Sequence, residues 1–379
     1  MRAFTVTMAV LVFASGIAAA KTLQVGPGKK YRMPCQAFEA AHDRDTIEID
    51  AAGKYDGDVC TISASGLTIR GVNGRPRIDA AGKDAQGKAI WVIAANNTTV
   101  ENIELSGCRV EDDNGAGIRQ EGANLTVRNC YFHDNENGIL SGRSAESEIL
   151  VENSEFARNG HGDGYSHNIY IGHVRRFTLK YSYFHHARGG QLVKSRAAEN
   201  HLIYNRLTDE GGSNYEIDLP NGGIAYVIGN VIQQSPTPEN SSLLAFGAEG
   251  PLPDSRLHVI NNTFVNDYST GLFVQVSRAV IRPSVIVNNI FAGPGQICSQ
   301  RDAILKTNFS GGDPMFEDRA HYDYHLRPGS PCLNIGISGS DPEIPISVAV
   351  RPTEQYVHPC RSEPRPVAGP IDIGAYERP

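Results

Sequence analysis

The sequence has little of what marks membrane and nucleic-acid-binding proteins. After residue 20 no stretch is long and apolar enough to cross a bilayer. The formal net charge of -7 is mild, which argues against a nucleic-acid partner. None of the seven cysteines lies in a CxxC or Cys/His pattern of the kind that binds zinc. We therefore expect a protein with no membrane span and no nucleic-acid partner.

The first 20 residues read as a secretory signal. Arg2 supplies a thin basic start, and residues 5–14 form an apolar run too short to span a bilayer. Residues 18–20 are three alanines, the small residues that a signal peptidase needs. We expect an exported protein that is secreted or periplasmic.

An oxidising compartment allows some of the seven cysteines to form disulfide bonds. The pairings we expect are Cys35–Cys60 and Cys108–Cys130. The remaining three, which can form one more bond and leave one thiol over, are Cys298, Cys332 and Cys360.

Helix-forming runs are scarce beyond residue 67, where a strand-like phrase repeats instead. Each copy is an alternating apolar pair, usually an Asn, and a further apolar residue; the copies are LTIRG, TVENIEL, TVRNCYF, LVENSEF, TLKYSYF, LIYNRLT, VIGNVIQ, HVINNTF and VIVNNIF. A period near 25 residues, built from Val, Ile, Thr and Asn, indicates a solenoid of strands rather than a helical repeat. The Asn positions, with Tyr181 standing in once, are Asn102, Asn129, Asn153, Asn205, Asn230, Asn261 and Asn288.

A second phrase follows each first one. Its copies are GAGIRQ, ENGILS, SHNIYIG, GGQLVKS, NYEIDLP, SLLAFG and TGLFVQ, and we align their apolar column as Ile118, Ile139, Ile169, Leu192, Ile217, Leu244 and Leu272. Two strand columns with an Asn turn between them predict an all-β fold, a right-handed parallel β-helix whose turns rise about 4.8 Å each. We expect the aligned Asn side chains to hydrogen-bond from turn to turn.

The regular turns end differently at the two ends of the chain. Residues 34–42 look like a short amphipathic helix, which would cover the open end of the first sheet. The turns stop near residue 310, and the Pro-rich tail after it cannot continue a regular ladder. We expect a capped β-helix domain over residues 21–310 and a C-terminal segment, residues 311–379, that wraps the end or lies along the side.

Both ends carry a resemblance. GPGKKYRMPCQAFEAA and TIEIDAAGKY near the start, and SPCLNIG and DIGAYE near the end, resemble the ends of secreted bacterial right-handed parallel β-helix proteins of the pectate-lyase-like superfamily. The resemblance implies that these stretches cap the solenoid and implies no catalytic role for them.

Polar residues gather on the middle turns, around residues 189–223. Side chains alternate between inside and outside along a strand. If the apolar column points inward, the outward columns include Arg119, Tyr170, Glu216 and Asp218. A polar groove across parallel strands suits a long polymer, so a polysaccharide is the partner that this pattern suggests. Tyr170 would stack on a sugar ring.

Lys194 breaks the alternation, because our alignment turns it inward, where a lone charge is costly. We expect the strand to end here and the turn to swing Lys194 outward, on the same side as Arg196. Two cations on one turn can neutralise a uronate carboxylate and so acidify the C5 proton that a base removes in β-elimination. A lysine near another cation, or partly desolvated, has a lowered pKa and can act as that base. The alternative is a surface ladder in which both cations pair with Glu216 and Asp218.

Glu216 and Asp218 lie two residues apart on one predicted strand. Such a pair can bind Ca²⁺, which would neutralise the substrate carboxylate. It can also supply the two carboxylates of a glycosidase. Charged residues on a wet surface explain the pair as well, and the sequence assigns no metal.

His167 and His173 flank the strand that precedes Lys194 by one turn. A histidine there can act as an acid or a base near neutral pH. A solvated loop histidine is the commoner case, and no spacing matches a zinc site.

The stretch QLVKSRAAENHLIYN is similar to the K-S-x-x-N-x-I-x-x-N stretch of β-helix alginate lyases, with two extra residues before the Asn. In that family the Lys is the Brønsted base and an Arg on the next turn is the acid, so the resemblance implies a base role for Lys194. This chain departs from the family where the Arg would stand, because it has YEIDLPNGG there. Arg196, Tyr215 or a histidine would have to be the acid. The WxDH-type motif of β-helix pectate lyases and the Asp-rich set of polygalacturonases are absent.

Together these patterns predict an exported, monomeric carbohydrate-active protein that cleaves an acidic, uronate-containing polysaccharide by β-elimination. Lys194 would be the base and Arg196 the carboxylate neutraliser or acid. Asp218 and Glu216 would orient Lys194, bind substrate hydroxyls or hold Ca²⁺. The other predicted substrate contacts are Tyr170, His167, His173, Arg119 and Tyr215. A glycoside hydrolase, a uronate epimerase and a non-catalytic polysaccharide-binding or export protein stay open as alternatives.

Overall fold

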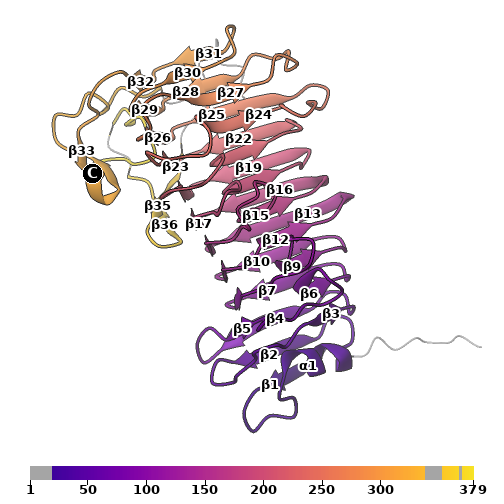
Figure 1. Ribbon diagram of the computed structural model, residues 1–379. Helices are drawn as coiled ribbons and strands as arrows, with labels where there is room; N and C mark the ends of the chain where they lie inside the picture. The colour runs from indigo at the N-terminus through magenta and orange to yellow at the C-terminus, as the bar shows by residue number, and fades with distance from the viewer. Residues whose placement is uncertain (1–18, 338–351, 367–368) are drawn as a thin grey trace, which may run out of the picture.

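The computed structural model describes residues 19–337, 352–366 and 369–379. Most regular structure in these ranges is parallel β-strand, stacked in successive turns of a solenoid (Figure 1). The predicted signal lies outside the described residues, apart from its last two. Within the described ranges no helix has the length and apolar character to cross a membrane.

Each full turn places one strand in each of three parallel sheets, in the order A, C, B along the chain. Sheet A consists of β1 (Thr22–Val25), β2 (Thr46–Asp50), β4 (Thr68–Val72), β7 (Thr98–Glu101), β10 (Leu125–Arg128), β13 (Ser144–Glu152), β16 (Val174–Lys180), β19 (Glu199–Ile203), β22 (Ile224–Ile228), β25 (Arg256–Ile260), β28 (Val285–Val287) and β31 (Ile304–Lys306). Sheet C consists of β5 (Arg77–Asp79), β8 (Glu104–Ser106), β11 (Tyr131–His133), β14 (Glu155–Ala157), β17 (Tyr183–His185), β20 (Arg206–Thr208), β23 (Val231–Gln234), β26 (Thr263–Asn266), β29 (Ile290–Ala292) and β32 (Phe309–Ser310). Sheet B consists of β3 (Cys60–Ile62), β6 (Ala89–Ile93), β9 (Ala116–Gln120), β12 (Asn137–Ser141), β15 (Ile169–Ile171), β18 (Val193–Ser195), β21 (Ile217–Leu219), β24 (Ser242–Phe246), β27 (Leu272–Val276) and β30 (Gln296–Cys298).

The core fills the space between the three sheets. Because side chains alternate along each strand, every turn adds apolar side chains to the same inward columns. On sheet C the rings of Phe132, Phe156 and Phe184 stack with centroids 4.8 and 4.4 Å apart. Each such pair adds about 0.5–1.5 kcal/mol beyond the burial of its surface. The repeated phrase of the sequence is therefore one layer of a continuous core.

The predicted Asn ladder is confirmed, but it occupies two adjacent columns rather than one. The first column has left-handed backbone, with φ between 51° and 59°, which Asn tolerates better than most residues; its members include Asn102, Asn129, Asn153, Tyr181, Asn261 and Asn288. The second column lies one residue later and is largely buried. There each side-chain oxygen accepts from the amide of the previous turn, through Asn205, Asn230, Asn262, Asn289 and Asn308. These bonds satisfy turn amides that water does not reach.

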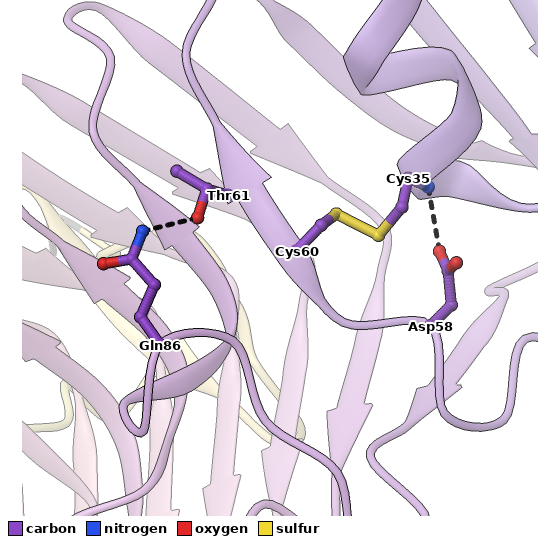
Figure 2. The surroundings of a disulfide bond; sticks show 5 residues. All are labelled: Cys35, Asp58, Cys60, Thr61 and Gln86. Atoms are coloured by element: carbon purple, nitrogen blue, oxygen red, sulfur yellow. Dashed lines mark hydrogen bonds between the residues drawn. A yellow bond between two sulfur atoms is a disulfide. The ribbon is translucent and has the colours of Figure 1, made fainter.

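The N-terminal helix forms as predicted. Helix α1 (Pro34–Ala40) packs against the first strands, where Phe38 meets Trp91 edge-on with ring centroids 5.3 Å apart. The predicted Cys35–Cys60 disulfide is confirmed and ties α1 to β3, as Figure 2 shows. Beside it, Asp58 accepts the Cys35 amide N–H at 2.9 Å. The cap is thus held by a covalent bond, a hydrogen bond and a ring contact.

The predicted Cys108–Cys130 disulfide is wrong, since both are buried free thiols. Cys108 follows the end of β8, whereas Cys130 precedes the start of β11, the neighbouring strand of sheet C. The two cysteines therefore lie at opposite ends of a strand pair. The third predicted bond does not form either, because the structure leaves Cys298, Cys332 and Cys360 free.

The tail lies along the side of the solenoid, which is one of the two arrangements we expected. Its described residues form two antiparallel hairpins. In the first, β33 (Phe316–Asp318) pairs with β34 (Asp323–Leu326) through the 3-10 helix η1 (Arg319–His321), and in the second, β35 (Glu354–Val357) pairs with β36 (Arg361–Pro364). In Figure 1 the second hairpin lies beside β17. Asn153 Nδ2 donates to the Cys360 carbonyl at 2.9 Å, and the Thr353 amide donates to Tyr204 Oη at 3.0 Å.

Candidate active site on sheet B

Lys194 lies in the middle of an outward column of sheet B. In register, Tyr170 of β15 pairs with Lys194 of β18, and Lys194 pairs with Asp218 of β21. The inward residue next to Lys194 is Val193, not Leu192 as our alignment assumed. The alignment that turned Lys194 inward is therefore wrong by one residue. Lys194 lies in the outward column, as we expected, but within strand β18 and not on a turn after the strand. The one-residue error arose because Leu192 and Val193 are both buried, so that two apolar residues fit the same column.

Four charged side chains converge around this column. Lys194 Nζ lies 3.3 Å from Asp218 Oδ2 and 3.7 Å from Glu249 Oε1. Arg196 Nη2 donates to Glu249 Oε2 at 2.6 Å. The side chains of Lys194, Arg196 and Asp218 are only 13%, 16% and 6% exposed, whereas Glu249 is 50% exposed. The three predicted catalytic residues meet, but Glu249 partly covers them.

Arg196 also joins the cluster to the turns on either side. Its Nε donates to Tyr170 Oη at 2.8 Å, and its Nη1 donates to Asn221 Oδ1 at 2.7 Å. The guanidinium carbon and Lys194 Nζ lie 5.8 and 5.9 Å from the centroid of the Tyr170 ring. Both cations therefore lie near the same aromatic ring, an arrangement that itself stabilises positive charge.

Burial and pairing shift the acidity of these groups. Burial raises the pKa of Asp218 even though Lys194 favours its charged form. Burial opposes the charged form of Glu249, but the hydrogen bond from Arg196 and the charge of Lys194 outweigh it and lower the pKa of Glu249. Burial, with the charge of Asp218, raises the pKa of half-buried Tyr215. The ionisation of Asp218 therefore depends on its partner Lys194.

His167 lies beneath the outward face. Its ring is 2% exposed and meets Tyr170 edge-on, with centroids 5.6 Å apart. Its Nδ1 accepts the Gln191 amide N–H at 3.2 Å. Burial, together with the nearby charge of Lys194, lowers the pKa of His167 to about 3. This placement is at odds with the predicted substrate contact, because the neutral ring supports Tyr170 from behind and has almost no exposed surface.

The prediction that Glu216 points outward is wrong. Glu216 is 0% exposed, and neither side-chain oxygen has a hydrogen-bond partner on another described residue. Its neighbours in register, Leu192 and Leu243, belong to the core. Burial raises the pKa of Glu216 well above its usual range, helped by the charge of Asp209. Period-two alternation failed here because Glu216 precedes the first residue of β21.

A pocket of about 400 Å³ adjoins the cluster through Tyr170. It brings together three predicted substrate contacts, Arg119, Tyr170 and His173, and adds Arg143. Burial, with the charges of Arg143 and Arg196, lowers the pKa of His173. The pocket is thus lined by two arginines and by acidic loop residues such as Asp163.

No pattern in the sequence pointed to Glu249, Asn221 or Arg143. All three lie outside the strands, in connections of irregular length where no column can be aligned. Glu249 reaches the cluster from the connection after β24, more than one turn beyond Lys194.

The predicted Ca²⁺ pair is not assembled. Glu216 lies in the core, whereas Asp218 pairs with Lys194, so the two carboxylates do not share a face. Among the described residues, donor groups close enough to share a metal ion lie elsewhere and are His185, His186 and Glu210, and Asp113, Glu136 and His161.

Comparisons with known proteins agree with this architecture. A family described as a right handed beta helix region matches residues 55–233. The crystal structure of pectate lyase Pel9A matches with a TM-score of 0.67 at 15% identity, over 96% of this chain and 98% of that one. No curated protein matches the sequence. The predicted right-handed parallel β-helix is thereby confirmed, and at 15% identity the structural match shows the fold alone.

Proposed function

We propose that this protein is exported and cleaves an acidic, uronate-containing polysaccharide by β-elimination at the cluster of Lys194, Arg196, Asp218 and Tyr170. The position of Glu249 carries the proposal. Its carboxylate bridges Arg196 at 2.6 Å and Lys194 at 3.7 Å. A uronate carboxylate has the same charge and shape, so it can take this place once the half-exposed Glu249 moves away.

The geometry then places a base beside the reacting carbon. In a uronate, C5 carries the carboxylate, so a carboxylate held by Arg196 brings the C5 proton near Lys194. Neutral Lys194 takes that proton, the C4–O bond breaks with its electron pair on the leaving oxygen, and a C4–C5 double bond forms. The leaving oxygen takes a proton from a hydroxyl such as that of Tyr170, which already hydrogen-bonds Arg196. Asp218 holds Lys194 in position.

Further features support a polymeric acidic substrate. Arg119 and Arg143 line the adjoining pocket on the same sheet, where neighbouring sugar units would lie. The Cys35–Cys60 disulfide fits an oxidising compartment outside the cytoplasm, where such polymers occur. The shared fold of Pel9A, which is described as a pectate lyase, adds an argument by analogy.

The proposal is tested with purified protein on a panel of uronate polymers, such as polygalacturonate and alginate. Elimination produces a 4,5-unsaturated sugar that absorbs ultraviolet light, so absorbance should rise with time on at least one polymer. New reducing ends without this absorbance would indicate hydrolysis and overturn the proposal.

A second candidate is non-catalytic polysaccharide binding. One observation favours it: Lys194, Arg196, Asp218 and Glu249 pair among themselves, so their charges already balance. Binding to a uronate polymer without either product would select this candidate. Hydrolysis by Glu216 and Asp218 loses its basis, because Glu216 is buried.

A further inference from the structure

Strand β17 of sheet C ends at His185, and a second histidine, His186, follows it directly. An extended backbone would send the rings of His185 and His186 to opposite faces. His186 instead has a left-handed backbone, with φ of 49°, and the two Nδ1 atoms lie only 2.8 Å apart. Glu210, just beyond β20 of the next turn, places its Oε2 3.2 Å from His186 Nε2. One ligand atom from each of the three side chains falls within 4.8 Å of the other two.

Neighbouring side chains hold this group in place. Glu155 Oε1 lies 3.2 Å from His185 Nε2 and accepts a hydrogen bond from the N–H at that position. In this tautomer His185 Nδ1 carries a lone pair. Tyr183 Oη donates to Glu210 Oε1 at 2.7 Å. The Tyr183 ring also stacks on His185, with centroids 4.2 Å apart. A carboxylate behind a ligating histidine and a donor behind a ligating carboxylate are the contacts that orient metal ligands.

The lone pairs of His185 Nδ1 and Glu210 Oε2 both face the ring of His186. A proton on each nitrogen of His186 would satisfy them, at the cost of charging that ring. A divalent cation held by His185, Glu210 and one nitrogen of His186 satisfies the same lone pairs and leaves the ring neutral.

A histidine two turns earlier in the same column, His133, shows how a histidine is satisfied without a metal ion. His133 of β11 stands in register with Ala157 and then His185. Its ring lies between Glu104 Oε1 at 3.1 Å and Asp134 Oδ2 at 2.7 Å. Burial opposes its charged form, but these two hydrogen bonds outweigh it and raise the pKa of His133. With both nitrogens donating to carboxylates, His133 has no lone pair left for a metal.

We propose that His185, His186 and Glu210 form a binding site for Zn²⁺ or a first-row divalent cation of similar ligand preference. Two imidazoles and one carboxylate are a zinc ligand set that leaves a position for water. Glu210 lies in the glycine-containing connection from β20 to β21, so a bound cation ties that connection to β17. None of the three ligands belongs to the cluster on sheet B, and the inference is independent of the proposed lyase activity.

The test is calorimetric titration of untagged, chelator-stripped protein with Zn²⁺, backed by the visible spectrum with Co²⁺. We expect one ion per chain in the wild type. His186→Ala should abolish binding, and Glu210→Gln, which keeps the side-chain volume, should weaken it at least about 10-fold. Tyr183→Phe removes only the bond behind Glu210 and should weaken binding about 10-fold, as changes behind a ligand usually do. His161→Ala, in the other close donor group, is the matched control and should bind like the wild type.

Absence of binding by the folded wild type would overturn the inference. Unchanged binding in both His186→Ala and Glu210→Gln would do the same, as would loss of binding in His161→Ala alone. Circular dichroism of each variant without metal shows that the comparison is made on folded protein.

Discussion

Two charge networks of similar composition lie on different sheets of this solenoid. On sheet A, Glu101, Arg128, Glu152 and Lys180 stand in register on four successive strands and pair along the column. On sheet B, two cations and two carboxylates also pair, but only Lys194 and Asp218 are in register.

The difference between the networks lies in burial and in the origin of the fourth member. Arg128 and Lys180 are 43% and 32% exposed, and each carboxylate of their ladder is supplied by a strand. Lys194 and Arg196 are much more buried, and their shared carboxylate comes from a connection outside the strands. A regular ladder of charges keeps neighbouring strands in register. A buried cation pair with a removable partner is suited to holding a ligand instead.

The largest expected contrast is in stability. Asp218→Ala leaves Lys194 mostly buried with only the more distant Glu249 beside it, so we expect a loss of about 3 kcal/mol, as for other broken buried pairs. Glu101→Ala in the exposed ladder should cost under about 1 kcal/mol. Urea unfolding of both variants measures the difference. Equal losses of unfolding free energy in the two variants would contradict the proposed difference between the networks.

Activity should separate the networks as well. Arg196→Ala removes the group that binds the carboxylate, so kcat/KM on the active polymer should fall about 10²–10³-fold, as when an electrostatic donor is deleted. Arg128→Ala should leave kcat/KM within about two-fold, since Arg128 belongs to the ladder. A wild-type kcat/KM for Arg196→Ala would show that Arg196 does not bind the substrate carboxylate.

The pH dependence of stability should differ in sign between the two regions. The folded-state pKa of Glu216 lies well above 4.5, so above that pH the folded protein keeps a proton that the unfolded chain releases. Unfolding free energy should therefore fall by up to about 1.4 kcal/mol per pH unit until Glu216 ionises in the fold. Glu216→Gln should remove the part of this decline that Glu216 contributes, whereas the part from Asp218, whose pKa burial also raises, should stay.

Glu152 of the ladder provides the opposite case. Burial opposes its charged form, but hydrogen bonds from Arg128 and Lys180 lower the pKa of Glu152. Its contribution to stability is therefore present above its unfolded pKa and lost as the pH falls through the folded one. Urea unfolding from about pH 2.5 to pH 8 distinguishes the two slopes, because the slope from Glu152 lies below its unfolded pKa. A flat profile for the wild type at higher pH would contradict the neutral state of Glu216.

The smallest effect concerns Glu249. If its carboxylate occupies the place of the substrate carboxylate, Glu249→Gln should lower KM a few-fold, roughly 1 kcal/mol of weaker competition. Glu152→Gln is the control and should leave KM unchanged. An increase of KM in Glu249→Gln would show that Glu249 helps to bind the substrate.

The repeated phrase predicted the fold because a solenoid is specified locally. Each copy encodes one strand pair and one turn, so the period and the Asn positions sufficed for the architecture. Lys194 and Arg196 were found because charged residues gather on the middle turns, whereas the break in alternation that we assigned to Lys194 came from the alignment. The register of their strand was missed because Leu192 and Val193 are both apolar, so that either residue could be aligned with the inward column.

Other parts of the site could not be read from the sequence. Glu216 looked like an outward residue because alternation holds only inside a strand, and this residue precedes β21. Glu249 is placed by the path of a connection rather than by any period. The Cys35–Cys60 bond was predicted from the oxidising compartment, whereas Cys108–Cys130 failed because the sequence does not tell which end of a strand each thiol occupies.

The most direct test of Lys194 as the base is the ultraviolet assay for unsaturated product with Lys194→Arg. Arginine can keep the ion pair with Asp218, but it does not give up its proton near neutral pH. We predict a fall in rate of about 10²–10⁴-fold with little change in melting temperature, and a wild-type rate for the ladder control Lys180→Arg. A folded Lys194→Arg variant that forms unsaturated product at the wild-type rate would contradict this account.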